Sequence, residues 1–95
     1  MEIRFSVHIT IETSTGRKEF GNFELGANRE TATELFTLLK GTTTPSGSRY
    51  ILLEFTEDIA GLAVPIGIKH CCLDELKENT AIITRAIFKT HQLEQ

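Results

Sequence analysis

The chain has 95 residues, of which 40% are apolar and 24% are charged, a composition typical of globular domains. Its length predicts one domain spanning residues 1–95. The net charge is -3, and the ten basic residues are spread along the chain. This argues against binding to a nucleic-acid phosphate backbone, which needs clustered Lys and Arg.

Three further features bear on cellular location. The longest uncharged stretch, Ile59 to Ile68, contains glycine and proline and is far short of the roughly 20 residues of a membrane helix. Met1 leads directly into a charged segment with no apolar leader. The adjacent cysteines, Cys71 and Cys72, do not form a disulfide framework. We expect a cytoplasmic protein without membrane contact.

Residues 2–12 alternate between polar and apolar side chains without exception. This period of two predicts a β-strand with one buried face. A second strand is predicted over residues 17–25, joined to the first by the short turn Ser14-Thr15-Gly16. Phe20 breaks its alternation, and Gly21 beside it suggests a bulge that would let Phe20 turn inward.

A helix is predicted next, with Asn28 as its N-cap and Gly41 as its C-terminal stop. Between them, apolar residues recur at helical spacing. Residues 42–48 then form a polar loop that contains proline and glycine.

Strands three and four are predicted over residues 50–57 and from residue 62 onward, with a turn at residues 58–61. Pro65 lacks an N–H group, so the fourth strand should lie at a sheet edge or contain a bulge. Alternation assigns four residues of this strand to the buried face: Leu62, Val64, Ile66 and Ile68.

The last predicted element is a helix from Leu73 to about His91. Its β-branched stretch at residues 80–84 lowers helix propensity, so a break near Asn79 is considered. The order ββαββα predicts a two-layer α+β fold. In its simplest assembly, one four-stranded antiparallel sheet carries both helices on the same face.

Such a sheet leaves one face open, and that face is our main candidate site. Apolar side chains surrounded by polar ones are typical of an association surface, and edge strands can add a strand from another chain. We therefore expect a non-enzymatic domain that binds a second copy of itself or another protein, without a cofactor. The residues predicted to form this surface are Arg4, Ser6, His8, Thr10, Tyr50 and Leu52.

The alternative is a small-ligand, anion or metal site, possibly enzymatic, at the start of the last helix. There alternation predicts His70 and Cys72 on the inner face and Cys71 on the outer face. Cys72 and Glu75 have the spacing of a capping box, and a helix N-terminus attracts anions. Two ligands are too few for zinc, and no metal or catalytic residue is assigned.

Nucleic-acid binding by the open face requires exposed aromatic side chains. Phe5 and Phe55 fall on the predicted buried face, which leaves only Tyr50 and Phe20 as candidates. His8 on the polar face is interpreted as a solvated side chain rather than a catalytic base. Neither pattern predicts nucleic-acid recognition or catalysis.

Overall fold

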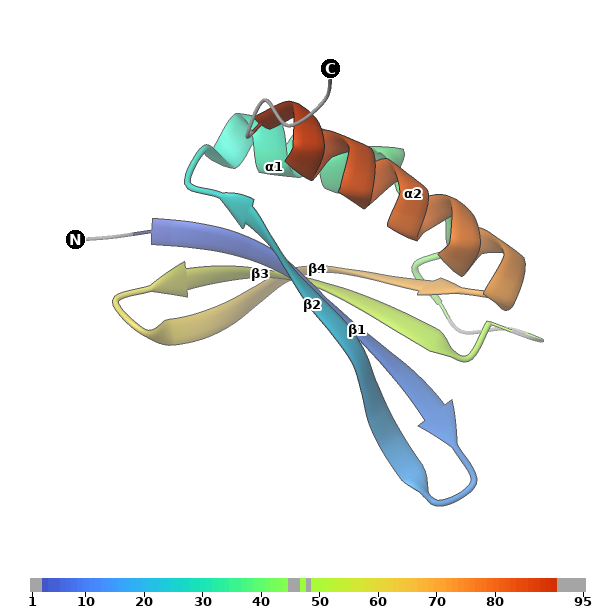
Figure 1. Ribbon diagram of the computed structural model, residues 1–95. Coiled ribbons are helices and arrows are strands. Elements are labelled where there is room, and N and C mark those ends of the chain that lie inside the picture. Colours follow the sequence, from blue (N-terminus) through green and yellow to red (C-terminus); the bar gives the residue numbers. More distant parts are fainter. Residues whose placement is uncertain (1–2, 45–46, 48, 91–95) are drawn as a thin grey trace.

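The computed structural model describes residues 3–44, 47 and 49–90. Its elements follow the order ββαββα, as predicted (Figure 1). The sheet is antiparallel, with strand order β2-β1-β3-β4. The bounds are β1 Ile3–Thr13, β2 Gly16–Gly26, α1 Arg29–Leu38, β3 Ile51–Ile59, β4 Leu62–Cys71 and α2 Leu73–Thr90.

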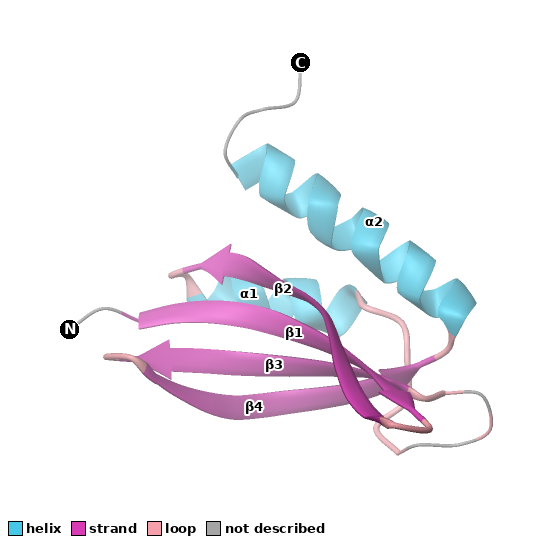
Figure 2. Cartoon of the chain, turned by 60° about the horizontal axis from the view of Figure 1, so that its bottom comes forward, coloured by secondary structure: helices cyan, strands magenta, loops and turns pink. Residues whose placement is uncertain are grey.

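Both helices lie on the same face of the sheet, which confirms the predicted architecture (Figure 1). The alternation of β1 explains this arrangement, because Phe5, Val7 and Ile9 are almost completely buried on the helix side. Side chains of both helices join them in one core, together with alternate residues of β3. The other face of the sheet is left uncovered (Figure 2).

A tight two-residue turn connects β3 to β4. Ala60 and Gly61 both have positive φ angles, of 52° and 88°, as a two-residue type I′ turn requires. β3 therefore continues to Ile59, two residues further than predicted. The Gly61 amide also donates to Asp58 Oδ1 at 2.9 Å, which fixes the tip of this hairpin.

α1 has the predicted N-cap. Asn28 Oδ1 accepts a hydrogen bond from the Thr31 amide at 2.9 Å, so one of the free N–H groups of the first turn is satisfied. The helix ends at Leu38, and Gly41 follows with a φ of 147°. A Cβ atom there would lie 2.7 Å from the His70 carbonyl oxygen, so Gly41 permits the close approach of this segment to β4.

The C-terminal end of α1 is held by a lysine from the sheet. Lys69 Nζ donates to the carbonyl oxygens of Phe36 and Leu39, both at 2.7 Å. The same ammonium lies 4.9 Å from the centroid of the Phe36 ring. A positive charge at this point satisfies free carbonyl groups and the negative end of the helix dipole. Burial, with a smaller effect of Lys40, lowers the pKa of Lys69.

Asn79 connects the two helices. It is completely buried in α2, where its Oδ1 accepts from the Lys40 amide at 2.6 Å and its Nδ2 donates to the Lys40 carbonyl at 2.9 Å. α2 is continuous through this position, so the break considered near Asn79 is wrong. The low helix propensity of the β-branched residues is overridden because Leu76 and Ile83, one turn to either side of Asn79, are buried in the core.

The structure of β4 differs from the prediction in its register and in the exposure of its apolar residues. β4 is an edge strand, as Pro65 indicated, but its register shifts at a bulge. Phe55 pairs with Gly67 and Thr56 with Pro65, so Ile66 is the extra residue. Alternation across the bulge therefore reverses, and Ile68 pairs with Glu54 on the open face rather than the buried one.

The four apolar residues predicted to be buried in β4 are instead exposed. Val64 pairs with Glu57 on the helix side, but α1 begins only at Arg29, whose guanidinium binds Glu57 at 2.5 Å. The helix stripe packs further along, where Phe36 stacks on Phe55 with ring centroids 4.9 Å apart. The exposed fractions are 67% for Leu62, 36% for Val64, 40% for Ile66 and 42% for Ile68.

We predict that Asn79→Ala destabilises the fold by about 2 kcal/mol, because the Lys40 amide and carbonyl lose their partners in a part-buried site. Urea unfolding measures this change as a lower midpoint. Asn22→Ala is the matched control, since Asn22 is exposed on β2, and it should change stability by less than about 0.5 kcal/mol. Equal effects of the two substitutions would contradict the role given to Asn79.

Candidate functional site

The open face of the sheet carries the residues predicted for the main site. Four of them come from β1, where Arg4, Ser6, His8 and Thr10 alternate with the buried core residues. Leu52 lies directly opposite Thr10 on β3. The structure therefore brings these five residues onto one face.

Tyr50 lies just before β3. Its carbonyl accepts a hydrogen bond from the Glu12 amide at 3.1 Å, so the backbone continues the β1–β3 pairing by one residue. Its side chain is 47% exposed. Tyr50 thus borders the open face at the end where β1 leads into its turn.

Directly paired residues form rows across the four strands of this face, and one row is polar on β2, β1 and β3 but apolar on β4. His8 pairs with Asn22 on β2 and with Glu54 on β3, and Glu54 pairs with Ile68 on β4. Directly opposed side chains in an antiparallel pair point to the same face. The row therefore runs from an amide through an imidazole and a carboxylate to an exposed isoleucine.

The next row also crosses all four strands, but its apolar residue lies on β3. Thr10 pairs with Glu19 on β2 and with Leu52 on β3, and Leu52 pairs with His70 on β4. His70 therefore lies on the open face, and its predicted inner position is wrong. The bulge at Ile66 is the reason, because it reverses the alternation for every later residue of β4.

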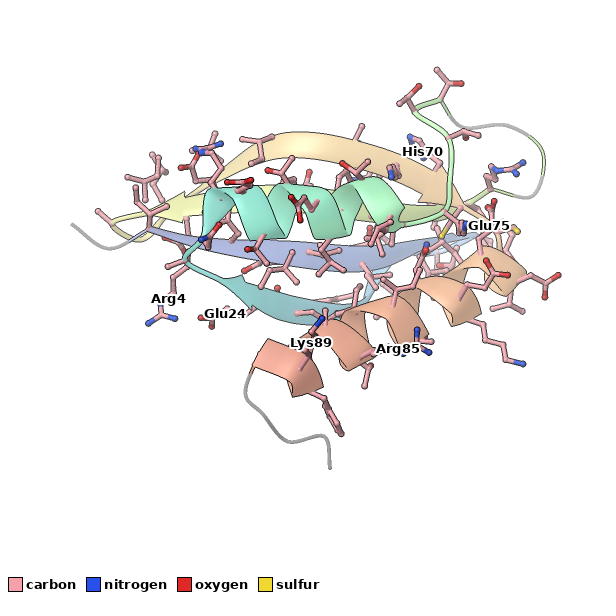
Figure 3. The ribbon with its side chains drawn as sticks, turned by 90° about the horizontal axis from the view of Figure 1, so that it is seen from above. Arg4, Glu24, His70, Glu75, Arg85 and Lys89 are labelled. Atoms are coloured by element: carbon pink, nitrogen blue, oxygen red, sulfur yellow. The ribbon has the colours of Figure 1, made fainter. Side chains whose placement is uncertain are left out.

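The polar half of the face includes an ion pair between Arg4 and Glu24 (Figure 3). Both side chains are about half exposed, so the pair contributes little to stability. Arg4 also pairs in register with Asp58 on β3. Charged side chains of this face thus come from β1, β2 and β3, whereas β4 contributes none between Leu62 and Ile68.

β2 has the bulge predicted beside Gly21. Ile9 pairs with Gly21 and Thr10 with Glu19, which leaves Phe20 as the extra residue. Phe20 does not turn inward, however, because 52% of it is exposed. A Cβ atom on Gly21 would lie 3.1 Å from the Phe23 ring, so Phe23 already fills the inner position that Phe20 was expected to take.

Cys71 lies on the face opposite to the predicted one. Cys71 pairs with Ile51 and is completely buried, whereas Cys72 is partly exposed at the start of α2. Burial, with a smaller effect of the Glu75 carboxylate, raises the pKa of the Cys71 thiol to about 11. Cys71 is therefore a protonated core residue at neutral pH, and its thiolate is not available for chemistry.

The N-terminus of α2 already has an anionic partner. Glu75 Oε1 accepts from the Cys72 amide at 3.0 Å, which is the predicted return contact of the capping box. Arg49 binds the other carboxylate oxygen at 3.3 Å. The hydrogen bond from Cys72 is the main cause that lowers the pKa of Glu75, against the opposing effect of burial, and Arg49 adds to it.

His70 is held through its backbone. Its amide and carbonyl form the two hydrogen bonds of a bridge with Thr42, at 2.7 and 2.9 Å. Thr42 therefore covers the outer edge of β4 at this point and does not belong to a free loop; residues 45, 46 and 48 of the predicted loop lie outside the described residues. A ligand site shared by His70 and Cys72 stays a prediction, opposed by the carboxylate at the helix end.

Among residues 3–44, 47 and 49–90, no group of three or more His, Cys, Asp or Glu side chains is arranged to hold a metal ion. Within the same part of the chain, no helix is both long and apolar enough to cross a membrane. Comparison with known proteins adds no assignment, because no family model, curated protein or solved structure matches the chain.

An exposed apolar edge is the feature that sequence alternation missed. We call its four exposed side chains the β4 strip: Leu62, Val64, Ile66 and Ile68. By register, Leu62 and Val64 lie on the helix side of the strand and Ile68 lies on the open face beside Leu52, with the bulge residue Ile66 between them. The available signal was Pro65 followed by Gly67, both of which interrupt regular strands.

Cysteine labelling tests the assigned faces. At pH 8, iodoacetamide should modify native Cys71→Ser but leave native Cys72→Ser unmodified, because only the thiol at residue 72 is accessible. Both variants should label fully in urea. Modification of native Cys72→Ser at the rate found in urea would show that residue 71 is not buried.

The Glu75 carboxylate should stabilise the fold in a pH-dependent way. Its folded pKa lies below the ordinary 4.5, so its contribution is complete above that value and is lost as the pH falls through the folded pKa. We expect Glu75→Gln to lower stability by about 1 kcal/mol at pH 7 and to have a smaller effect at pH 3.

Urea unfolding at the two pH values measures this difference. Glu78→Gln, at an exposed position of the same helix, is the control and should behave like the unmodified chain at both. If Glu75→Gln lowers the stability by the same amount at pH 3 as at pH 7, the carboxylate charge does not cause the effect.

Proposed function

We propose that this chain is a non-enzymatic association domain and that it forms a homodimer through the β4 strip and the adjoining open face. The observation that carries the proposal is the exposure of four large apolar side chains on one edge strand. An exposed apolar edge strand promotes association unless something covers it.

The two edges of the sheet differ in a way that favours β4. β2 has charged residues along its length and bulges at Phe20 and Leu25, and both features discourage strand addition. β4 has no charged residue from Leu62 to Ile68. Its own interruptions, Pro65 and the bulge at Ile66, limit backbone pairing, so side-chain packing supplies most of the contact.

A second copy fits this surface better than a charged partner. Each chain carries a net charge of -3, so a stable contact between two copies must not place like charges against one another. The β4 strip meets this condition. Two such strips related by a twofold axis pack the edge of β4, with the apolar side chains of both its faces, against the same edge of the second copy, the usual arrangement of homodimers.

The polar residues of the open face then border the contact on the side of β1. His8, Thr10 and Ser6 lie one strand further from the strip, beyond Leu52 and Glu54 on β3. Interfaces commonly have an apolar centre and a polar, solvent-accessible rim. In this arrangement Leu52 and His70 lie at the margin of the buried patch, and Arg4 lies outside it.

Native mass spectrometry tests the proposal. We expect a mass near twice the 10.6 kDa of the chain, and Ile66→Lys should shift it to the monomer, because a buried unpaired charge strongly weakens an interface. Phe20→Lys is the matched control at an exposed position on the other edge, and it should remain dimeric.

Circular dichroism checks that both variants keep the fold. A monomer at chain concentrations up to about 1 mM, which corresponds to a dissociation free energy below about 4 kcal/mol, would contradict the proposal. Loss of the dimer in both lysine variants alike would contradict the location of the interface.

A further inference from the structure

An apolar groove lies at the opposite edge of the sheet from the β4 strip. It is formed where β2, α1 and α2 meet and has a volume of about 470 Å³. Small-molecule sites in proteins typically have volumes of roughly 300–1,000 Å³ and mostly apolar walls. The apolar side chains that line this groove are Phe23, Leu25, Ala32, Leu35, Ala86 and Ile87.

The groove exists because α2 diverges from the sheet. Its fully buried residues all lie in the first two-thirds of the helix, ending at Ile83. Beyond that point Ala86 and Ile87 are only partly buried, and the end of the helix stands away from the strands (Figures 1 and 2).

Small residues keep the space open. Ala32 on α1 and Ala86 on α2 line the groove from its two helical walls. On β2, Leu25 is the extra residue of a bulge, and Gly26 follows it with a φ of 93°. The groove is thus a continuation of the hydrophobic core that the chain's described side chains do not fill.

The mouth of the groove is polar, and Lys89 adds a positive charge beside it. Arg4, Glu24, Asn22 and Thr31 line it. Lys89, in the last turn of α2, points from that helix toward β2 (Figure 3). Arg4 and Glu24 form an ion pair with each other, so Lys89 supplies the positive charge of the mouth, in a chain whose net charge is negative.

We propose that this groove binds an amphiphile with one apolar chain and a carboxylate head group. The apolar chain lies between the helices against Leu35 and Ile87, where it removes exposed apolar surface from water. The carboxylate lies at the mouth near Lys89. The proposal is independent of dimerisation, since the groove and the β4 strip share no residue.

Titration of the full chain with dodecanoate, followed by calorimetry and by methyl NMR, tests this site. We expect saturable one-to-one binding with shifts of the Leu25, Leu35 and Ile87 methyl signals. Ala86→Phe fills the groove and should weaken binding at least about tenfold. Ala81→Phe, which adds the same ring on the exposed side of α2, should bind as the unmodified chain does.

A second pair of variants tests the head group. Lys89→Gln should weaken dodecanoate binding about fivefold, as expected for one partly exposed ion pair, and should leave dodecanol binding unchanged. Lys77→Gln, at an exposed position elsewhere on α2, is its control. If Ala86→Phe fails to fold, the methyl shifts of the unmodified chain decide the location by themselves.

Three results would overturn the proposal: no binding at about 1 mM dodecanoate, equal binding by Ala86→Phe and the unmodified chain, or methyl shifts confined to the β4 strip. Native mass spectrometry of the same samples reports the oligomeric state separately. If dodecanoate does not bind, the dimer can still be observed. If the chain is a monomer, dodecanoate binding can still be measured in the monomer.

Discussion

The C-terminal end of α1 is the point at which the sheet and both helices are joined. Lys69 from β4 binds the carbonyl groups of Phe36 and Leu39, while Asn79 from α2 binds both backbone groups of Lys40. The Thr42–His70 bridge adds the strand edge to the same junction. Polar groups that would be costly if left unpaired are satisfied here by residues distant in sequence.

This junction determines which parts of the sheet are covered. With α1 fixed over β3 and β4 at its C-terminal end, its stripe packs Phe36 onto Phe55. The far end of β4 extends beyond the helix, so Leu62 and Val64 remain exposed. α2 is fixed near its start and middle by Leu76, Asn79 and Ile83, so its last turns diverge and open the groove beside β2.

The two proposed surfaces therefore have a common physical origin. Two helices, of 10 and 18 residues, do not cover a sheet of four strands whose lengths reach 11 residues. The uncovered apolar area lies at both edges, as the exposed strip on β4 and as a groove at β2. A strip without charge suits contact with a like surface, whereas a groove with a lysine at its mouth suits a narrow anionic ligand.

By itself, the sequence determined the six elements, their order and several local contacts. Strict alternation identified β1, and Asn28 and Glu75 were recognised as capping residues, because these signals depend only on near neighbours. It also assigned Arg4, Ser6, His8 and Thr10 to one open face, which β1 confirms. The tertiary structure alone decided the faces of β4: Ile66 became the bulge only through pairing with β3, and this reversed His70, Cys71 and Ile68. Register and helix divergence depend on contacts between distant segments, and such contacts are not encoded in local periodicity.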